Sequence, residues 1–421
     1  MKVVLHCSLA CLLGAPIFAE TPAQLADRAE QLIRGGSTGQ ALTALAEAAA
    51  SPSPSAQSED KIGFLFAVLG HQDDAIGHFE KALALDSHYA PAHYHVGVAW
   101  CLAKNFDRGL PELNQAVQLD RSAFDYVFRL GSAQLETGSY NQAVASLKQA
   151  VALNASNAGA WNALGHALQR QGEFAAAVNA YGKALTLDPK DDASRNDYAY
   201  ALIETRQADK AIQESQKVLS HDPANLAAQM NVGYAYLKKG EFQKAETAYN
   251  TASRLDPKSA AAHYDLGIAL KMQDKIEAAQ TEFNQAIILD PTLPEAHFSL
   301  GITNWQLGNF PAAMEQMQAA VAIRPDYAEA HYMLGITLKQ SGDLDHAIPE
   351  LKEAIRLDPS TPGPYNMLGQ ILRIKGDKQG SAEVFATGAR LKREREAHLA
   401  NTLDQGMRGG TAPAALPAPS R

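Results

Sequence analysis

Cysteine is scarce in this chain. Only three cysteines occur among 421 residues, and Cys7 and Cys11 lie in an amino-terminal leader that we expect to be removed. The remaining Cys101 cannot form an internal disulfide, so packing must hold the fold together. Aromatic residues make up only 7% of the chain, whereas hydrophobic residues make up 46%. We therefore expect a core that consists mainly of alanine and leucine.

Motifs of catalysis are also missing. The sequence has no glycine-rich phosphate loop ending in Lys-Ser or Lys-Thr, no paired-histidine zinc helix and no Gly-x-Ser-x-Gly elbow. We predict that the protein is not an enzyme, and we assign it no catalytic, cofactor-binding or metal-binding residues. The net charge is −9, or −10 once Lys2 leaves with the leader, and no basic stripe favours nucleic acid.

The leader itself resembles a secretion signal. Lys2 gives it a positive start, Val3–Ala19 is mostly apolar, and Ala19 before Glu20 supplies the small residue at the cut. We predict a signal peptide over residues 1–19 and an exported protein, periplasmic or secreted. Two alternatives are an amphipathic first helix of a cytosolic protein and a lipoprotein signal ending at Cys11. Beyond the leader, no stretch is apolar enough to span a bilayer.

What the chain does contain is a period of 34 residues. Glycine stands at 63, 97, 131, 165, 233, 267, 301, 335 and 369, and the one skipped position holds Ala199. Alanine recurs twelve and nineteen residues after most of these glycines, with a bulky apolar residue such as Phe283 or Met317 between the two alanines. Proline closes most units, usually as Asp-Pro, and a second glycine marks a turn inside most of them. Each unit is therefore expected to be a pair of packed helices.

The pattern resembles the tetratricopeptide repeat family, for example at Leu334, Gly335, Ala347, Leu351 and Pro359. The resemblance implies an all-α, right-handed superhelical solenoid of antiparallel helix pairs, with ten clear repeats and a degenerate amino-terminal unit. We expect a capping repeat over 20–55, the repeat array over 56–390, a capping helix over 391–408 and a disordered tail over 409–421. The weakest interior repeat is 192–225, where some irregularity of stacking is expected.

Histidine recurs at the fourth site of four repeats, as His93, His263, His297 and His331, where the family commonly has tryptophan. A metal-binding or pH-sensing ladder is one interpretation. Equivalent sites on stacked helices lie about 8–10 Å apart, too far for ligands that share a zinc with bonds of about 2.0–2.1 Å. We therefore expect these histidines to pack between the paired helices.

A partner-binding groove is predicted in the repeats from 226 to 395. In the family, groove-facing sites include the fifth, ninth and twelfth of each unit, and here the ninth holds isoleucines and the twelfth holds three cations and a tryptophan. Exposed isoleucines edged with positive charge are one possibility; the other is that the isoleucines pack against neighbouring first helices. The predicted groove residues are Tyr264, Ile268, Lys271, Phe298, Ile302, Trp305, Tyr332, Ile336, Lys339 and Arg373.

The resemblance implies a non-enzymatic scaffold that binds a peptide or protein segment in the concave groove. Apolar anchors with acidic groups or a free carboxylate would suit the predicted groove residues. The alternative is a non-catalytic subunit, or a substrate-presenting arm, of a cell-envelope enzyme, secretion or assembly complex. The family's sugar-transferring members carry an asparagine ladder at the sixth site, which reads His95, Arg129, Ala163 and Asp197 in successive repeats here, so that variant is disfavoured.

Overall fold

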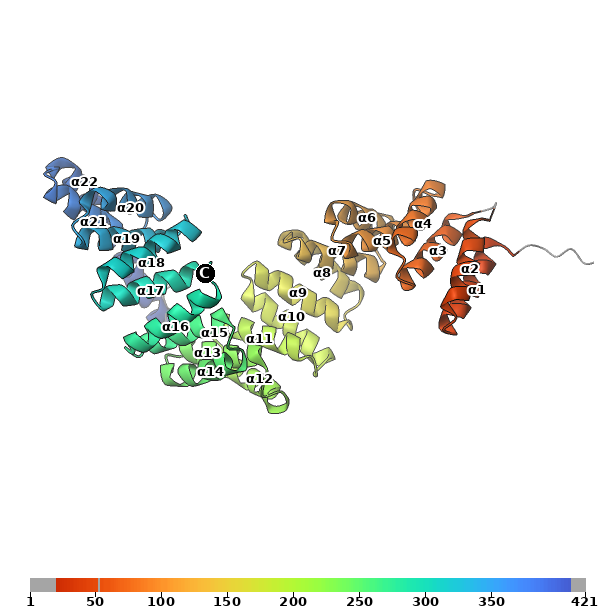
Figure 1. Cartoon of the computed structure of the whole chain (residues 1–421), viewed down its shortest axis with the longest axis horizontal. Coiled ribbons are helices and arrows are strands. Elements are labelled where there is room, and N and C mark those ends of the chain that lie inside the picture. Colours follow the sequence, from red (N-terminus) through yellow and green to blue (C-terminus); the bar gives the residue numbers. More distant parts are fainter. Residues whose placement is uncertain (1–19, 52–53, 410–421) are drawn as a thin grey trace, which may run out of the picture. The chain divides into compact units, whose positions relative to one another are not determined.

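The structure is a computed structural model that describes residues 20–51 and 54–409 (Figure 1). The predicted leader over 1–19 lies outside these residues, and so does the predicted tail over 409–421 apart from Gly409, which ends the last helix. Every regular element among the described residues is a helix. The chain divides into two compact units, Met1–Thr205 and Arg206–Arg421, each of which is described by itself. The division falls inside the 192–225 repeat, whose sequence departs most from the repeat pattern.

The first unit consists of helix pairs stacked in chain order. From α1 to α10, each first helix packs on the second helix of its own repeat, and each second helix packs on the next first helix. The helices are α1 (Pro22–Arg34), α2 (Thr38–Ala49), α3 (Ala56–Val68), α4 (Gln72–Leu85), α5 (Ala90–Leu102), α6 (Phe106–Leu119), α7 (Phe124–Glu136), α8 (Tyr140–Leu153), α9 (Ala158–Arg170), α10 (Phe174–Leu187) and α11 (Asp192–Glu204).

The second unit continues the same alternation. Its helices are α12 (Ala208–His221), α13 (Leu226–Lys238), α14 (Phe242–Leu255), α15 (Ala260–Lys271), α16 (Ile276–Leu289), α17 (Pro294–Gln306), α18 (Phe310–Ile323), α19 (Ala328–Gln340), α20 (Leu344–Leu357), α21 (Pro362–Ile374) and α22 (Lys378–Gly409). The residues predicted as a capping helix, 391–408, continue α22 without interruption. None of the described helices is long and apolar enough to cross a membrane.

The paired helices approach closely at the repeated glycine. A Cβ on Gly267 of α15 would stand 2.6 Å from Cε1 of Phe283 on α16, and Phe283 is fully buried. Ala279 and Ala286, one turn to either side of Phe283, are fully buried as well. The predicted small, bulky, small arrangement is therefore the contact between the two helices of a repeat.

The turn inside each repeat requires a left-handed backbone. Gly342, for example, has φ of 83°. Three repeats place other residues at the equivalent position: Lys104 (φ 60°), Arg206 (φ 62°) and Asp274 (φ 61°). Because a Cβ disfavours this region of backbone conformation, these three turns store strain that their glycine counterparts avoid.

The fourth site of the repeat has a shared structural role. Long polar side chains there donate a hydrogen bond to the carbonyl oxygen six residues earlier, which belongs to the link between repeats. The bonds run from His93 Nε2 to Ser87 (3.0 Å), Trp161 Nε1 to Ala155 (2.9 Å), His297 Nε2 to Pro291 (3.1 Å), His331 Nε2 to Pro325 (3.0 Å) and Tyr365 Oη to Pro359 (3.2 Å), and Arg195 donates likewise to Pro189. The site thus anchors the link to the first helix.

The histidines at this site make a second bond that tryptophan cannot make. Nδ1 of His331 lies 2.6 Å from Oε2 of Glu350 on α20, the second helix of the same repeat. His93 and His263 meet Glu112 and Glu282 in the same way. The predicted packing role is confirmed for His297 and His331, which are buried, and each histidine of the ladder bonds within its own repeat.

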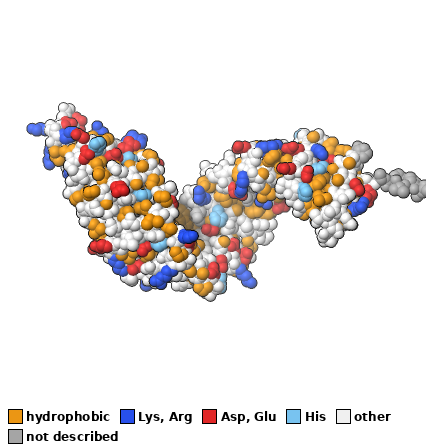
Figure 2. Space-filling view, in the orientation of Figure 1, with side chains coloured by type: hydrophobic (Ala, Val, Ile, Leu, Met, Phe, Trp, Pro, Cys, Tyr) orange, Lys and Arg blue, Asp and Glu red, His pale blue; other side chains and the backbone are white. Residues whose placement is uncertain are grey.

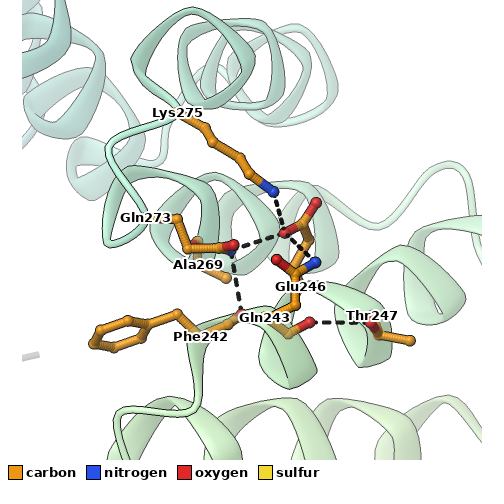
Figure 3. Close-up of polar contacts among 7 residues, drawn as sticks. All are labelled: Phe242, Gln243, Glu246, Thr247, Ala269, Gln273 and Lys275. Atoms are coloured by element: carbon orange, nitrogen blue, oxygen red, sulfur yellow. Dashed lines mark hydrogen bonds and ion pairs between the residues drawn. The ribbon is translucent and has the colours of Figure 1, made fainter.

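Polar side chains also join successive repeats. Gln273, in the turn between α15 and α16, donates to Oε2 of Glu246 on α14 (2.8 Å) and to the carbonyl of Ala269 (3.0 Å) (Figure 3). Lys275 reaches the same carboxylate oxygen at 2.8 Å. Burial opposes ionisation of Glu246, but the bonds from Lys275 and Gln273 outweigh it and lower the pKa of this carboxyl. The turn of one repeat is thereby fixed to the second helix of the previous one.

Candidate functional site

The predicted groove residues lie on four first helices of the second unit. Tyr264, Ile268 and Lys271 belong to α15, and their spacing of four and three residues places them on one helix face. Phe298, Ile302 and Trp305 take the same places on α17, and Tyr332, Ile336 and Lys339 take them on α19. Arg373 belongs to α21. We call these ten residues the first-helix face.

Neighbouring helices bring these rows together. Helix α17 contacts α19, and α19 contacts α21. The Nζ atom of Lys339 donates to Oε1 of Gln370 on α21 at 2.7 Å. Tyr332 lies over α21, where a Cβ on Gly363 would stand 2.8 Å from the tyrosine hydroxyl. Neither Gln370 nor Gly363 was predicted. Gln370 stands at the ninth site of its repeat and Gly363 at the second, and these positions could have identified them.

The first-helix face is less exposed than the sequence suggested. Only Arg373 is exposed, and the other nine residues are half-buried. Ile268 packs against the core around Phe283, and Ile302 packs against the core around Leu334 and Leu351. The sequence left open whether the isoleucines are exposed or packed. The packing alternative describes Ile268 and Ile302 correctly.

The aromatic residues of the fifth site are packed in the same manner. The ring of Tyr264 lies 5.8 Å from that of Phe283, and the ring of Phe298 lies 4.9 Å from that of Tyr327. Burial raises the pKa of the Tyr332 hydroxyl. These rings therefore form the wall of the face rather than free anchors. Over both units, Figure 2 shows hydrophobic side chains interspersed with polar ones.

Two polar groups of the twelfth site have no partner among residues 20–51 and 54–409. Burial lowers the pKa of the Lys271 ammonium, and no described carboxylate or carbonyl pairs with it. In the next repeat, the Nε1–H group of Trp305 is buried and donates no hydrogen bond within the described part of the chain. An unpaired half-buried ammonium and an unpaired buried N–H both destabilise the free protein. Both donors suit an acceptor that is a carboxylate.

Other potential chemistry is sparse. No group of three or more histidine, cysteine or acidic side chains that could hold a metal ion occurs in the described ranges. Cys101 is buried, and burial raises the pKa of its thiol, which disfavours the reactive thiolate.

The stacked helix pairs define an all-α repeat solenoid, and comparisons with known proteins give its family. Tetratricopeptide repeat family models match residues 232–294 and 264–328, and another matches 304–371. The model of the cytochrome c-type biogenesis protein H TPR domain matches 141–262, and that of the bacterial transcriptional activator domain matches 69–188. The chain belongs to the tetratricopeptide repeat family.

Solved structures with a similar fold include several repeat proteins. A tetratricopeptide repeat protein from Parabacteroides merdae is 14% identical with a TM-score of 0.53, covering 59% of this chain and 98% of that one. MamA from Desulfovibrio magneticus is 26% identical, with a TM-score of 0.39 and coverages of 41% and 97%. Yeast Tom70 is 15% identical, with a TM-score of 0.47 and coverages of 92% and 96%. A search of curated protein sequences finds no match.

Proposed function

We propose that this protein-interaction scaffold binds a protein segment carrying a carboxylate along the first-helix face of its second unit. The observation that carries the proposal is the pair of unpartnered donors at equivalent sites, Lys271 and Trp305. A bound carboxylate would supply the partner that the half-buried Lys271 ammonium lacks. Lys339 and Arg373 continue the cationic row, which suits a segment with further acidic groups.

The test uses a peptide library with free carboxyl termini, selected on the full chain. We expect Lys271→Met to weaken the selected peptides at least ten-fold, or about 1.4 kcal/mol. The same variant should unfold at a higher temperature than the parent, because it removes an unpaired, half-buried charge. Lys352→Met, on the exposed face of α20, is the control and should change neither property.

Two results would contradict this function. Selected peptides that bind Lys271→Met with parental affinity would show that the ammonium does not contact the partner. If the peptides bind equally well after their terminal and side-chain carboxylates are amidated, the ligand does not need a carboxylate. Truncation of Trp305 or Tyr332 to alanine is a poorer test, because both side chains are half-buried and their loss would disturb packing.

A second candidate function is a non-catalytic subunit of an assembly complex in the cell envelope. The match of residues 141–262 to the TPR domain of cytochrome c-type biogenesis protein H supports it. Export is part of this candidate, and we expect the protein isolated from its host to begin at Glu20. Deleting its gene should then deplete haem-stained c-type cytochromes. An intact Met1 in the cytosolic fraction, or unchanged cytochrome levels, would count against it.

A further inference from the structure

A cleft of about 550 Å³ opens in the first unit. It lies between α6, α7 and α8, so two second helices and one first helix form its walls. Its rim is polar and its floor includes the buried Leu130. We call it the amide cleft, because five side-chain amides line it: Asn114, Gln118, Gln134, Gln142 and Gln149. Arg121 also lines it.

The amide cleft lies at a repeat whose eleventh site lacks the leucine that several other repeats bury there. Gln134 occupies the eleventh site of its repeat, where Leu168, Leu202, Leu270 and Leu338 are buried in other repeats. At the preceding junction, the eleventh site holds Trp100, and the guanidinium of Arg108 stacks 3.6 Å from the centre of its ring. The crevice left there is only about 250 Å³. A glutamine at 134, with Ser146 facing it, leaves the space open.

Most hydrogen-bonding capacity in the amide cleft is unused. Oε1 of Gln134 accepts from the Ser146 hydroxyl at 2.8 Å, which leaves the amide N–H₂ of Gln134 available. Nε2 of Gln149 donates to the Arg121 carbonyl at 3.0 Å, which leaves its Oε1 available. Within the described chain, the side chains of Asn114, Gln118 and Gln142 have no hydrogen-bond partner. The lining of the cleft therefore offers both hydrogen-bond donors and hydrogen-bond acceptors.

The charges of the amide cleft narrow the class of ligand. No carboxylate lines it, and Arg121 is its single cation, so neither a polycation nor a polyphosphate is matched. No aromatic side chain and no strand edge is present for the usual modes of peptide capture. A ligand whose groups both donate and accept, and which has apolar faces for Leu130 and Val117, fits best. Sugar rings have these properties.

We propose that the amide cleft binds a short uncharged oligosaccharide. Its volume lies within the range of about 300–1,000 Å³ typical of small-molecule sites. The amides pair with vicinal hydroxyls, each of which donates and accepts, while the C–H faces of the sugar pack on the apolar floor. This function is additional to binding along the first-helix face, since it uses other helices in the other unit.

The test is calorimetric titration of the full chain with maltotriose, cellotriose and chitotriose, each up to about 10 mM, a range that detects millimolar binding. We expect at least one of them to bind. Gln134→Leu, which restores the leucine of other repeats, and Gln118→Ala, an exposed helix position, should each weaken binding at least five-fold. Gln318→Ala, on the exposed face of α18, is the matched control and should bind like the parent.

Three outcomes would overturn the proposal. The first is no binding of any of the three sugars by the parent chain. The second is binding that Gln134→Leu and Gln118→Ala leave unchanged, since the sugar would then occupy another site. The third concerns tetra-alanine, which is tested alongside the sugars: the two variants weaken the binding of tetra-alanine but leave sugar binding unchanged. That result would make the amide cleft a peptide site.

Discussion

Replacing glycine by alanine at the helix–helix contact should destabilise the protein according to what the new methyl group meets. In Gly267→Ala, the methyl would stand 2.6 Å from Cε1 and 2.7 Å from Cδ1 of Phe283. Ordinary carbon–carbon contacts lie at about 3.5–4.0 Å, so the ring or the helix must shift by about 1 Å. The ring cannot rotate freely, because Phe283 is fully buried.

The magnitude follows from two opposing effects. Overpacking of this kind costs about 1–3 kcal/mol. Alanine in place of glycine inside a helix returns about 0.5–1 kcal/mol. The net loss expected for Gly267→Ala is therefore about 0.5–2 kcal/mol. In Gly301→Ala the nearest atom is the terminal methyl of Met317, at 2.7 Å. Met317 is also fully buried, but its chain is more flexible than a ring, so the net loss should be smaller than in Gly267→Ala.

Gly77→Ala, inside α4, is the matched control, because a Cβ there meets nothing within 4 Å. It should stabilise the protein by about 0.5–1 kcal/mol. Hydrogen exchange read by mass spectrometry is the assay, because units of a repeat array couple mainly to their neighbours. Faster exchange in Gly267→Ala should centre on α15 and α16 and spare α1–α8. Equal stability of Gly267→Ala and Gly77→Ala would refute the close-contact account.

Two further predictions concern a turn and a histidine. Asp274→Gly should raise the unfolding temperature by relieving the positive φ of 61°, whereas Asp274→Ala, which keeps the Cβ, should not. Glu350 raises the pKa of His331, so this pair should stabilise the fold fully below the unfolded histidine pKa of about 6.5 and lose that stabilisation as pH rises through the folded value. Between about pH 5 and 8, the parent chain should therefore unfold at a higher temperature than Glu350→Gln, and the difference should shrink as the pH rises. A difference that stays constant would contradict this coupling between protonation of His331 and stability.

The repeat pattern predicted the fold well because its spacing reports local packing. The contact between Gly267 and Phe283, and the turn at Gly342, lie within one repeat, where sequence separation and position in space are fixed together. The family resemblance likewise identified which side chains share a face on α15, α17 and α19.

Exposure was harder to predict, because it depends on how successive first helices stack. The sequence does not show that Tyr332 covers Gly363 or that Ile302 joins the core around Leu334. The sequence did not predict the amide cleft either. Gln134 is an ordinary surface residue by composition, and only comparison with the leucines at its repeat position shows that it leaves a space unfilled.

The shared bond of the fourth site has a consequence for comparing relatives of this chain. Histidine, tryptophan, tyrosine and arginine all reach the same carbonyl, as His297, Trp161, Tyr365 and Arg195 show. Evolution can therefore exchange these four residue types without moving the backbone, provided that a long donor remains. Relatives that differ among these residue types at this site keep the same hydrogen bond to the link. Such differences should therefore not be taken as a change of partner. A short side chain such as Val127, in contrast, leaves the link of its repeat without this anchor.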